Sequence, residues 1–469
     1  MKEYPIYLGN ERIYSSNKTE ILSPYKNKIV GIINMADSEH IERAVELAKH
    51  AFQKTKKMPA FKRSEILMNI AKEISEDRKE IATTLALECG KNIKFAKGEV
   101  LRAIQTFTIA AEESKRIQGE FFGLDAVSQG KEKSAIVKRF PIGPILGITP
   151  FNYPLNLVAH KVAPAIAVGN PIIIKPSSLA PLTSITLAEI VAKYAPKGML
   201  SVLPCKGSQI EKAVINPDIK MVSFTGSPVV GWKLKQMCGK KRICLELGGN
   251  AGAILDKDCD IDSALSACVI GAFANAGQVC IHTQKIFVHE NIYDNFITQF
   301  VKKSEKIKNG NPLDQNVFLN PMITEEEAIR AEDWINEAVN SGAKILCGGN
   351  RKDNFLDATV ITDTKREMKV EYKEVFAPIV IVKKFSKFTD AVEMINDTEY
   401  GLQAGIFSNN MKNIMYAFEN IDVGGVIINN TPTFRVDQMP YGGIKNSGFG
   451  REGLRYSIEE MTERKLMVL

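Results

Sequence analysis

The sequence predicts an α/β protein with two doubly wound domains. In the first half of the chain, five short apolar runs alternate with helical segments, a pattern typical of a parallel sheet with helices on both faces. A second alternation of strand-like and helix-like segments begins near Ala251. With 469 residues and 45% hydrophobic content, the chain is long enough to form two or three separate cores.

The N-terminal part of the chain is predicted to be mainly helical. Apolar residues recur at helical spacing over Ser38–Gln53 and Ser64–Cys89, and a further helix is predicted over Ile93–Gln118. Glycines and polar residues then interrupt the pattern until strand-like alternation resumes at Ser134–Arg139. We interpret the interruption as a projecting hairpin.

The predicted strands are short apolar runs bounded by turn residues. Those of the first domain are Ile145–Thr149, Pro171–Lys175, Met199–Leu203, Met221–Phe224 and Ile243–Leu247. Those of the second domain are Ile286–Val288, Lys344–Leu346, Thr359–Ile361, Ile379–Val382, Gly405–Phe407 and Gly425–Ile428.

Charge and cysteine content exclude several functional classes. The formal charge of +7 is spread over 61 basic and 54 acidic residues, and the basic clusters are short, so we expect no nucleic-acid partner. The N-terminus lacks the apolar core of a signal peptide and no stretch has the length of a membrane span, so we expect a cytoplasmic protein with no membrane partner. The eight cysteines lack paired spacing and form no Cys/His cluster, which predicts reduced thiols and no metal site.

Cys280 and Glu246 are the strongest candidates for catalysis. Cys280 follows Asn275-Ala276-Gly277-Gln278-Val279, and Glu246 lies in Leu245-Glu246-Leu247-Gly248-Gly249. A thiolate attacks an aldehyde carbon well, and a carboxylate within reach of water can release the thioester that results. Each residue alone also has an ordinary interpretation, because cysteine is often a small buried apolar residue and glutamate is often solvated or paired.

Five further motifs accompany these two segments: Pro150-Phe151-Asn152-Tyr153-Pro154, Lys175-Pro176-Ser177-Ser178, Phe224-Thr225-Gly226-Ser227, Glu374-Val375-Phe376-Ala377-Pro378 and Pro440-Tyr441-Gly442-Gly443-Ile444-Lys445-Asn446-Ser447-Gly448. Together, the seven motifs resemble those of the NAD(P)-dependent aldehyde dehydrogenase superfamily, and most closely its lactaldehyde-type and phosphonoacetaldehyde-type members. The resemblance extends from about Asn17 to the C-terminus.

The resemblance implies an aldehyde-dehydrogenase-like fold with a small oligomerisation arm. It places a cofactor-binding domain at residues 1–118 and 138–246, and a catalytic domain at residues 247–440. Oligomerisation segments are expected at residues 119–137 and 441–469, and the assembly is expected to be a homodimer or homotetramer.

The resemblance also implies a reaction scheme, the non-acylating oxidation of an aldehyde to its carboxylic acid. Cys280 attacks the aldehyde, and the Asn152 side-chain amide and the Cys280 backbone amide stabilise the oxyanion. Hydride transfer to the nicotinamide leaves a thioester, which water attacks with Glu246 as the base. As an alternative, Asn152 is an ordinary turn residue.

The predicted cofactor is NADP or NAD. Gly226 and Ser227 precede a helix whose N-terminus can face a pyrophosphate, although an ordinary tight turn also explains this junction. The resemblance places Lys175 against the adenosine ribose. Ser178 stands where NAD-preferring members usually carry glutamate, which favours NADP or dual use; alternatively, Ser178 caps a helix beginning near Ala180.

The resemblance assigns further cofactor contacts to Glu374, which would hold the nicotinamide ribose, and to Phe376 and Phe151 beside it. Lys285 departs from the pattern, because many members carry arginine five residues after the nucleophile.

Substrate candidates are basic residues near segments that shape the tunnel in relatives. Arg102, His160 and Arg435 indicate a small polar or anionic aldehyde that carries a carboxylate, sulfonate or phosphonate. Each could instead form a structural ion pair. His282 is a further candidate, with a neutral packing role as the alternative.

Three other functions are open from the sequence. A CoA-acylating dehydrogenase would use the same thiol but generally lacks the glutamate base, and a phosphorylating enzyme would require phosphate. The third possibility is a non-catalytic protein that keeps the fold.

Overall fold

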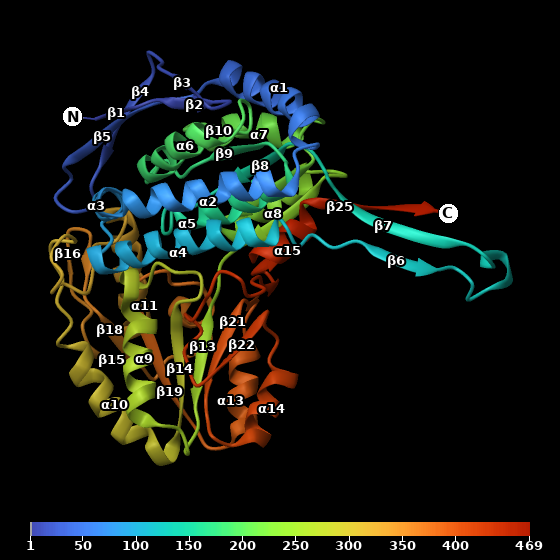
Figure 1. Cartoon of the computed structure of the whole chain (residues 1–469). Coiled ribbons are helices and arrows are strands. Elements are labelled where there is room, and N and C mark those ends of the chain that lie inside the picture. Colours follow the sequence, from blue (N-terminus) through green and yellow to red (C-terminus); the bar gives the residue numbers. More distant parts are fainter. Residues whose placement is uncertain (1) are drawn as a thin grey trace.

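The computed structural model describes residues 2–469 and contains two large sheets and a projecting arm (Figure 1). The first sheet has the order β24-β12-β11-β8-β9-β10-β2-β3. Its strands are β24 (Gly448–Phe449), β12 (Arg242–Glu246), β11 (Met221–Thr225), β8 (Ile145–Ile148), β9 (Ile172–Lys175), β10 (Leu200–Val202), β2 (Ile6–Leu8) and β3 (Glu11–Ile13). The five from β12 to β10 are parallel, in the doubly wound arrangement that the sequence predicts.

The second sheet has the order β15-β18-β19-β14-β13-β21-β22 and is parallel except at β15. Its strands are β15 (Lys344–Cys347), β18 (Thr359–Thr362), β19 (Ile379–Phe385), β14 (Thr283–His289), β13 (Ala251–Leu255), β21 (Gln403–Phe407) and β22 (Gly425–Ile428). The predicted fold class is therefore confirmed.

Both faces of each large sheet are buried, which explains the continuous apolar strands. Along β8, Ile145 packs in one core cluster and Leu146 in another on the opposite face, because successive side chains of a strand point to opposite sides. The second sheet divides in the same way, with Ile286 of β14 in one cluster and Phe287 in the other. Each domain thus has its own core.

Helices cover these faces (Figure 1). Those of the first domain are α1 (Ser38–Thr55), α2 (Ala60–Glu76), α3 (Arg78–Cys89), α4 (Ile93–Glu113), α5 (Asn156–Val168), α6 (Leu182–Tyr194), α7 (Gly207–Ile215), α8 (Pro228–Met237) and α15 (Leu454–Glu460). Those of the second are α9 (Ile261–Phe273), α10 (Glu290–Ser304), α11 (Glu325–Asn340), α12 (Lys369–Tyr372), α13 (Phe388–Asn396) and α14 (Met411–Asn420). Among residues 2–469, no helix is both long and apolar enough to cross a membrane.

Helix ends follow local chemistry. The Asp37 carboxylate accepts from the His40 amide and begins α1, and Asp260 accepts from the Asp262 and Ser263 amides and begins α9. The predicted helix Ser64–Cys89 is two helices, because the chain leaves helical geometry at Asp77.

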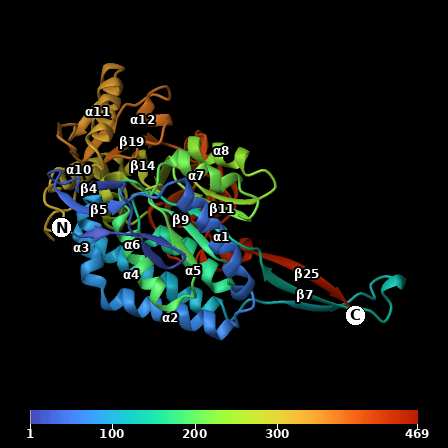
Figure 2. The same cartoon turned by 90° about the horizontal axis from the view of Figure 1, so that it is seen from above.

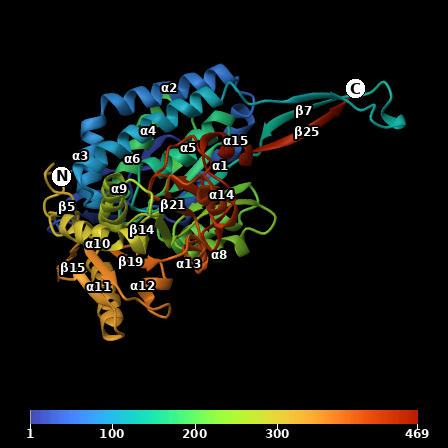
Figure 3. The ribbon, with the colours of Figure 1, turned by 90° about the horizontal axis from the view of Figure 1, so that it is seen from below.

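Helix α5 is buried along its whole length, as expected for a helix that is apolar on all sides. It packs against α2, α4 and α15, and Figure 3 shows these helices from below. Its buried polar side chains therefore face other protein groups and not bulk water, which is important for the site.

The projecting arm is a three-stranded antiparallel sheet of β6 (Glu120–Gly123), β7 (Ser134–Pro141) and β25 (Thr462–Val468) (Figures 1 and 2). The predicted hairpin corresponds to β6 and β7. The segment predicted at residues 441–469 divides differently, because β24 joins the first sheet and α15 packs on α4 and α5, which leaves only β25 in the arm.

Smaller strands complete the chain. At the N-terminus, β1 (Glu3–Tyr4), β5 (Ile29–Asn34) and β4 (Lys18–Leu22) form a three-stranded sheet. Two-strand pairs are formed by β16 (Arg351–Lys352) with β17 (Phe355–Leu356), and by β20 (Tyr400–Gly401) with β23 (Ile444–Lys445).

Candidate active site

The candidate site lies where the strand order of the first sheet reverses. Strand β9 continues the sheet on one side of β8 and β11 on the other, so the loops after β8 and β11 separate at this point, a common position for ligands in α/β sheets. The loop after β8 carries Phe151 and Asn152, and the loop after β11 carries Gly226 and Ser227. Glu246 ends β12 at the same edge.

The loop before Cys280 has an unusual backbone. Asn275, Ala276 and Gly277 have consecutive positive φ angles of 53°, 53° and 66°. A side chain at Gly277 would meet the Ala377 carbonyl oxygen at 2.0 Å, so only glycine fits this close approach. Left-handed residues outside glycine are uncommon and often occur at functional sites.

The Cys280 sulfur lies in a largely enclosed position. Its Sγ is 3.0 Å from the Tyr441 hydroxyl, and its side chain packs against the cluster that contains Val279, Ile281 and Leu402. Burial raises the pKa of the Cys280 thiol to about 11, while the hydrogen bond with Tyr441 and the charge of Arg435 act in the opposite direction. The thiol is therefore protonated at neutral pH in this arrangement.

Asn152 lies beside the Cys280 loop. Its Nδ2 donates to the Gln278 carbonyl at 3.0 Å, two residues before the thiol, and its buried Oδ1 has no partner within residues 2–469. The hydrogen bonds of the described chain include none donated by the Cys280 amide. The Asn152 side-chain amide and the Cys280 backbone N–H thus lie at the same loop, and these are the two kinds of donor that an oxyanion site uses.

Glu246 is buried, and neither carboxylate oxygen has a hydrogen-bond partner within residues 2–469. Its Oε1 lies close to Gly442, where an added Cβ would approach it to 2.9 Å. Burial and then the neighbouring Glu452 raise the pKa of Glu246 well above its ordinary value. This environment therefore favours the protonated form of the Glu246 carboxyl group.

A row of buried charged groups continues from Tyr441. The Arg435 guanidinium lies 3.6 Å from the centre of the Tyr441 ring and 3.5 Å from the Glu452 carboxylate. Lys161 of α5 pairs with Glu452 at 2.7 Å and donates to Ser223 and Thr225. The Nε of Arg435 is buried and has no partner within residues 2–469.

The predicted phosphate-binding junction has free donors. Ser227 is the N-cap of α8, is exposed and makes no side-chain capping bond, while Pro228 occupies the first turn. The first amides of a helix have no intrahelical acceptor, so those of α8 can receive an anion. Gly226 donates to the Glu246 carbonyl, which ties this turn to β12.

Lys175 and Ser178 lie on the loop after β9. Lys175 is buried, donates to the Pro176 carbonyl at 3.0 Å and belongs to none of the ion pairs of residues 2–469. Burial lowers its pKa. Helix α6 begins at Leu182, and the Glu88 carboxylate accepts from its first amides, so the expectation that Ser178 caps a helix near Ala180 is wrong.

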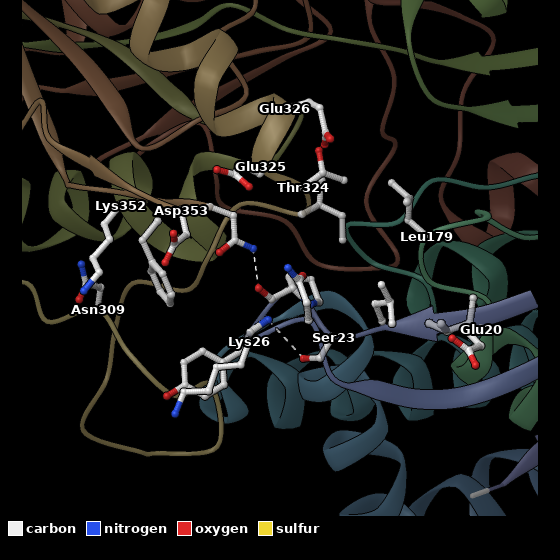
Figure 4. Close-up of a pocket in the computed structure, with 18 of the residues that line it drawn as sticks. Glu20, Ser23, Lys26, Leu179, Asn309, Thr324, Glu325, Glu326, Lys352 and Asp353 are labelled. Atoms are coloured by element: carbon white, nitrogen blue, oxygen red, sulfur yellow. Dashed lines mark hydrogen bonds between the residues drawn. The ribbon is translucent and has the colours of Figure 1, made fainter.

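Ser178 is exposed and borders a pocket of about 840 Å³ between the two domains (Figure 4). The pocket is also lined by the turn between β4 and β5, by Thr324–Glu326 and by Lys352–Phe355. Cys280 and Glu246 are not among its lining residues. The pocket thus lies beside the predicted adenosine end of the site and away from the thiol.

Phe151 and Phe376 come from different domains and meet edge to face, with ring centroids 6.1 Å apart. Glu374 accepts from the Gly249 amide at 3.0 Å, and burial raises its pKa to about 7. Glu374 thus lies against the Gly248–Gly249 segment that follows β12, and Phe376, two residues later in the chain, meets Phe151.

Arg102 and His160 share a carboxylate partner. Asp437 accepts from Arg102 at 2.7 Å, from Asn156 at 3.0 Å, and lies 2.8 Å from His160 Nε2. Burial alone would raise the pKa of Asp437, but His160 and Arg102 hold it well below its usual range. Arg102 thus forms a structural ion pair with Asp437, and His160, whose pKa is lowered by burial, forms a hydrogen bond with the same carboxylate.

The polar contacts of His282 and Lys285 are with groups other than the thiol. His282 Nε2 is 2.8 Å from the Ala272 carbonyl of α9, and burial lowers its pKa to about 4, as in the predicted packing role. Lys285 lies 3.8 Å from Glu371, and burial lowers its pKa.

Sequence reasoning missed Tyr441, Glu452, Asp437 and Lys161. Tyr441 and Asp437 stand in or beside quoted motifs, and the only available signal was their position there. Lys161 and Glu452 are distant in the chain and meet only in the fold.

Comparison with known proteins gives the same family. The profile of the aldehyde dehydrogenase family matches residues 13–467. A 3-sulfolactaldehyde dehydrogenase from Priestia aryabhattai is 41% identical, over 100% of this chain and 98% of its own length. Aldehyde dehydrogenase 21 from Physcomitrella patens, solved in complex with the reaction product succinate, is 43% identical with a TM-score of 0.98, over 100% of this chain and 98% of that one.

A glyceraldehyde-3-phosphate dehydrogenase from Methanocaldococcus jannaschii, solved with NADP, is 39% identical with a TM-score of 0.93, over 97% of this chain and 100% of that one. The predicted enzyme class, an NAD(P)-dependent aldehyde dehydrogenase, is confirmed by these matches. The chain therefore belongs to the aldehyde dehydrogenase family.

Proposed function

We propose that the protein oxidises a small anionic aldehyde to its carboxylic acid without CoA or phosphate, with NADP or NAD as the hydride acceptor. The observation that carries this proposal is the convergence of three segments, which bring the Cys280 thiol, the Asn152 amide and the Glu246 carboxyl group to one enclosed place. Glu246 favours hydrolysis of the thioester over transfer to CoA.

In the first step, the Cys280 sulfur forms a bond to the aldehyde carbon, and the carbonyl oxygen gains negative charge. Asn152 and the Cys280 amide are the donors for that oxygen, and because both are uncharged they stabilise it without pairing with the thiolate. A bound nicotinamide supplies the acceptor for the hydride that leaves the former aldehyde carbon.

In the second step, Glu246 takes a proton from the water that attacks the thioester. Its enclosed position excludes bulk water, and its raised pKa makes it a strong base once ionised. The sulfur leaves as the carbon–oxygen bond forms, which returns the Cys280 thiolate and releases the acid.

Arg435 is the best placed of the four substrate candidates. It is buried, it is close enough to Cys280 to lower the pKa of the thiol, and its Nε has no partner in the described chain. Arg102 and His160 are instead held by Asp437, and we assign them to the wall of the site. Sulfolactaldehyde and succinate, named for two relatives, carry a sulfonate and a carboxylate, which guanidinium groups bind well.

The cofactor preference that we propose is NADP. Lys175 is a buried cation without a carboxylate partner, and Ser178 is an exposed hydroxyl three residues away on the same loop. A 2′-phosphate would be received by both, whereas a glutamate at this position would repel it. Gly226, Ser227 and the α8 amides would hold the pyrophosphate.

The proposal is tested with short aldehydes bearing a carboxylate, sulfonate or phosphonate, assayed without CoA and with or without phosphate. Cys280→Ser is expected to lower turnover at least about a thousandfold while cofactor binding is kept. Glu246→Gln is expected to release about one equivalent of reduced cofactor per site and then slow about 100-fold or more, because the acyl-enzyme accumulates. Wild-type turnover by either variant, or a strict need for CoA or phosphate, contradicts the proposal.

A further inference from the structure

Tyr441 is held firmly with its hydroxyl group beside the Cys280 sulfur. Its ring is buried among Val279, Ile281 and Leu402. Its backbone exchanges two hydrogen bonds with Glu452, of 3.0 Å from the Tyr441 amide and 2.7 Å from the Glu452 amide. The hydroxyl is thus fixed 3.0 Å from Sγ by packing on the ring and by pairing of the backbone.

The direction of the Tyr441–Cys280 hydrogen bond depends on the state of the sulfur. A thiol and a phenol can each donate, but a thiolate can only accept. Burial, and then the charge of an ionised Cys280, raise the pKa of Tyr441 well above its ordinary value, so ionisation of the sulfur itself opposes loss of the phenol proton. Once Cys280 is ionised, Tyr441 must therefore be the donor.

Arg435 adds a positive charge over the same ring. Its guanidinium lies 3.6 Å from the ring centre, and it approaches from the segment before the Pro-Tyr-Gly-Gly motif. Two carboxyl groups also face Cys280, those of Glu374 and Glu246, and when ionised both oppose a charged sulfur. Tyr441 and Arg435 are the neighbours that favour the thiolate.

We propose that Tyr441 is a catalytic residue that stabilises the Cys280 thiolate by donating a hydrogen bond to Sγ, with Arg435 stacked on its ring in support. The inference rests on the proposed role of Cys280 as the nucleophile. On ionisation the thiol proton passes to water, and Tyr441 retains its own. Once the carbon–sulfur bond has formed, the hydrogen bond from Tyr441 to the sulfur weakens, because a thioether sulfur is a weak acceptor.

The test replaces Tyr441 by phenylalanine, which keeps the ring, its packing and its contact with Arg435 and removes only the donor. Alkylation by iodoacetamide is followed at the Cys280 peptide by mass spectrometry after brief exposure to pH 7 to 12, a range that includes the thiol pKa of about 11; the thiolate sulfur attacks the methylene carbon and iodide leaves. We expect the rate at pH 7.5 to fall about tenfold and the midpoint of the pH profile to rise by about one unit.

Tyr7→Phe is the matched control. Tyr7 is a buried tyrosine of β2 whose hydroxyl accepts from Arg12 at 3.1 Å, in a different core cluster. This variant is expected to leave the alkylation rate of Cys280 and the pH midpoint unchanged. Thermal unfolding of both variants, compared with the wild type, measures any general loss of packing.

The outcomes separate this inference from the proposed function. An unchanged rate and midpoint in Tyr441→Phe overturn the role of Tyr441, even if Cys280 is the nucleophile. If wild-type Cys280 reacts no faster than the other seven cysteines, the nucleophile assignment itself fails. A lower rate with the same midpoint also overturns the inference, because it indicates lost access to the sulfur and no change in its ionisation.

Discussion

At the scale of single residues, the Glu246 carboxyl group is the clearest case of a buried polar group without partners in residues 2–469. A buried carboxyl group without a hydrogen-bond partner is costly, by about 1–3 kcal/mol for a neutral polar group and more for a charged one. Both Glu246 carboxyl oxygens are buried and have no hydrogen-bond partner within residues 2–469. The group can act as a base only after water or a side-chain movement gives its ionised form a partner, so ionisation is coupled to the state of the site.

We also expect cofactor choice to depend on a single residue, Ser178. Ser178→Glu is expected to change the preference from NADP towards NAD, because the carboxylate repels a 2′-phosphate and accepts from a ribose hydroxyl. We expect the NADP to NAD ratio of kcat/KM to fall about 100-fold, which corresponds to about 2.7 kcal/mol at 1.36 kcal/mol per tenfold. Steady-state kinetics with both cofactors measure this ratio.

Ser177→Glu, one residue earlier on the same loop, is the matched control. Its hydroxyl accepts from the Leu179 amide and has no assigned cofactor contact. A wild type that already prefers NAD strongly would reject the assignment of Ser178.

At the scale of elements, the loop that carries Asn152 is fixed by residues at the junction of α3 and α4. Helix α3 ends at Cys89 and is capped by Gly90, which has a φ of 65°, and the chain then places Lys91 in a fully buried position. Lys91 pairs with Glu99, lies 3.9 Å from the Tyr153 ring centre and donates to the Asn152 carbonyl at 2.6 Å. Glu99 in turn accepts from two backbone amides at the start of α5.

Lys91→Met is therefore expected to lower the free energy of unfolding by about 3–5 kcal/mol, because Glu99 is left buried without its partner. Urea denaturation measures the change. The double variant Lys91→Met with Glu99→Gln is expected to recover part of the loss, and Lys94→Met, at an exposed lysine of the same segment, to change stability by less than about 0.5 kcal/mol. Equal stability of the wild type and Lys91→Met would show that the pair does not hold this loop.

Some elements of the fold can be predicted from the sequence, and others cannot. The strands of the first domain were predictable because both their faces are buried and their residues are apolar and β-branched, as in β9. Strand β13 was not predicted, because its Ala-Gly-Ala start carries little β signal, and its place in the sheet comes from its neighbours β14 and β21. The break at Asp77 was missed because the apolar pattern continues through it.

The candidate site divides in the same way. Cys280, Glu246 and Asn152 were predictable because each lies in a motif, and their catalytic roles stay proposals. The buried ion pair of Lys161 and Glu452 could not be predicted from the sequence, because the two residues are 291 positions apart and no local pattern links them. Likewise, nothing near Arg102 in the sequence indicated that its guanidinium group would pair with the Asp437 carboxylate.

At the scale of the whole molecule, the arm presents apolar side chains to solvent. Phe121, Ile136 and Met467 lie directly opposite one another in β6, β7 and β25, so they share one face of the arm. Phe121 is 70% exposed and Met467 is 50% exposed. A projecting strand sheet with an uncovered apolar row is typical of a surface that another subunit covers.

We therefore expect a homodimer or homotetramer, and we expect Phe121→Lys combined with Met467→Lys to reduce its mass, because four charges or more would be buried without partners in a symmetric assembly. Light scattering coupled to size exclusion measures the mass. Phe61→Lys, at a phenylalanine of α2 that is 62% exposed, is the control and is expected to leave the mass unchanged. A monomeric wild type would contradict the expectation.

The complete burial of α5 has a consequence for how this enzyme can change. One turn of this helix supplies His160 and Lys161 to the buried charged groups beside the candidate site, while its remaining side chains fill the interior of the first domain. Altering either residue to suit a different aldehyde also disturbs the interior that keeps the domain folded. New specificities are thus expected to arise on the segment around Arg435, where the backbone is not part of a packed helix, and α5 is expected to vary little among enzymes with different substrates.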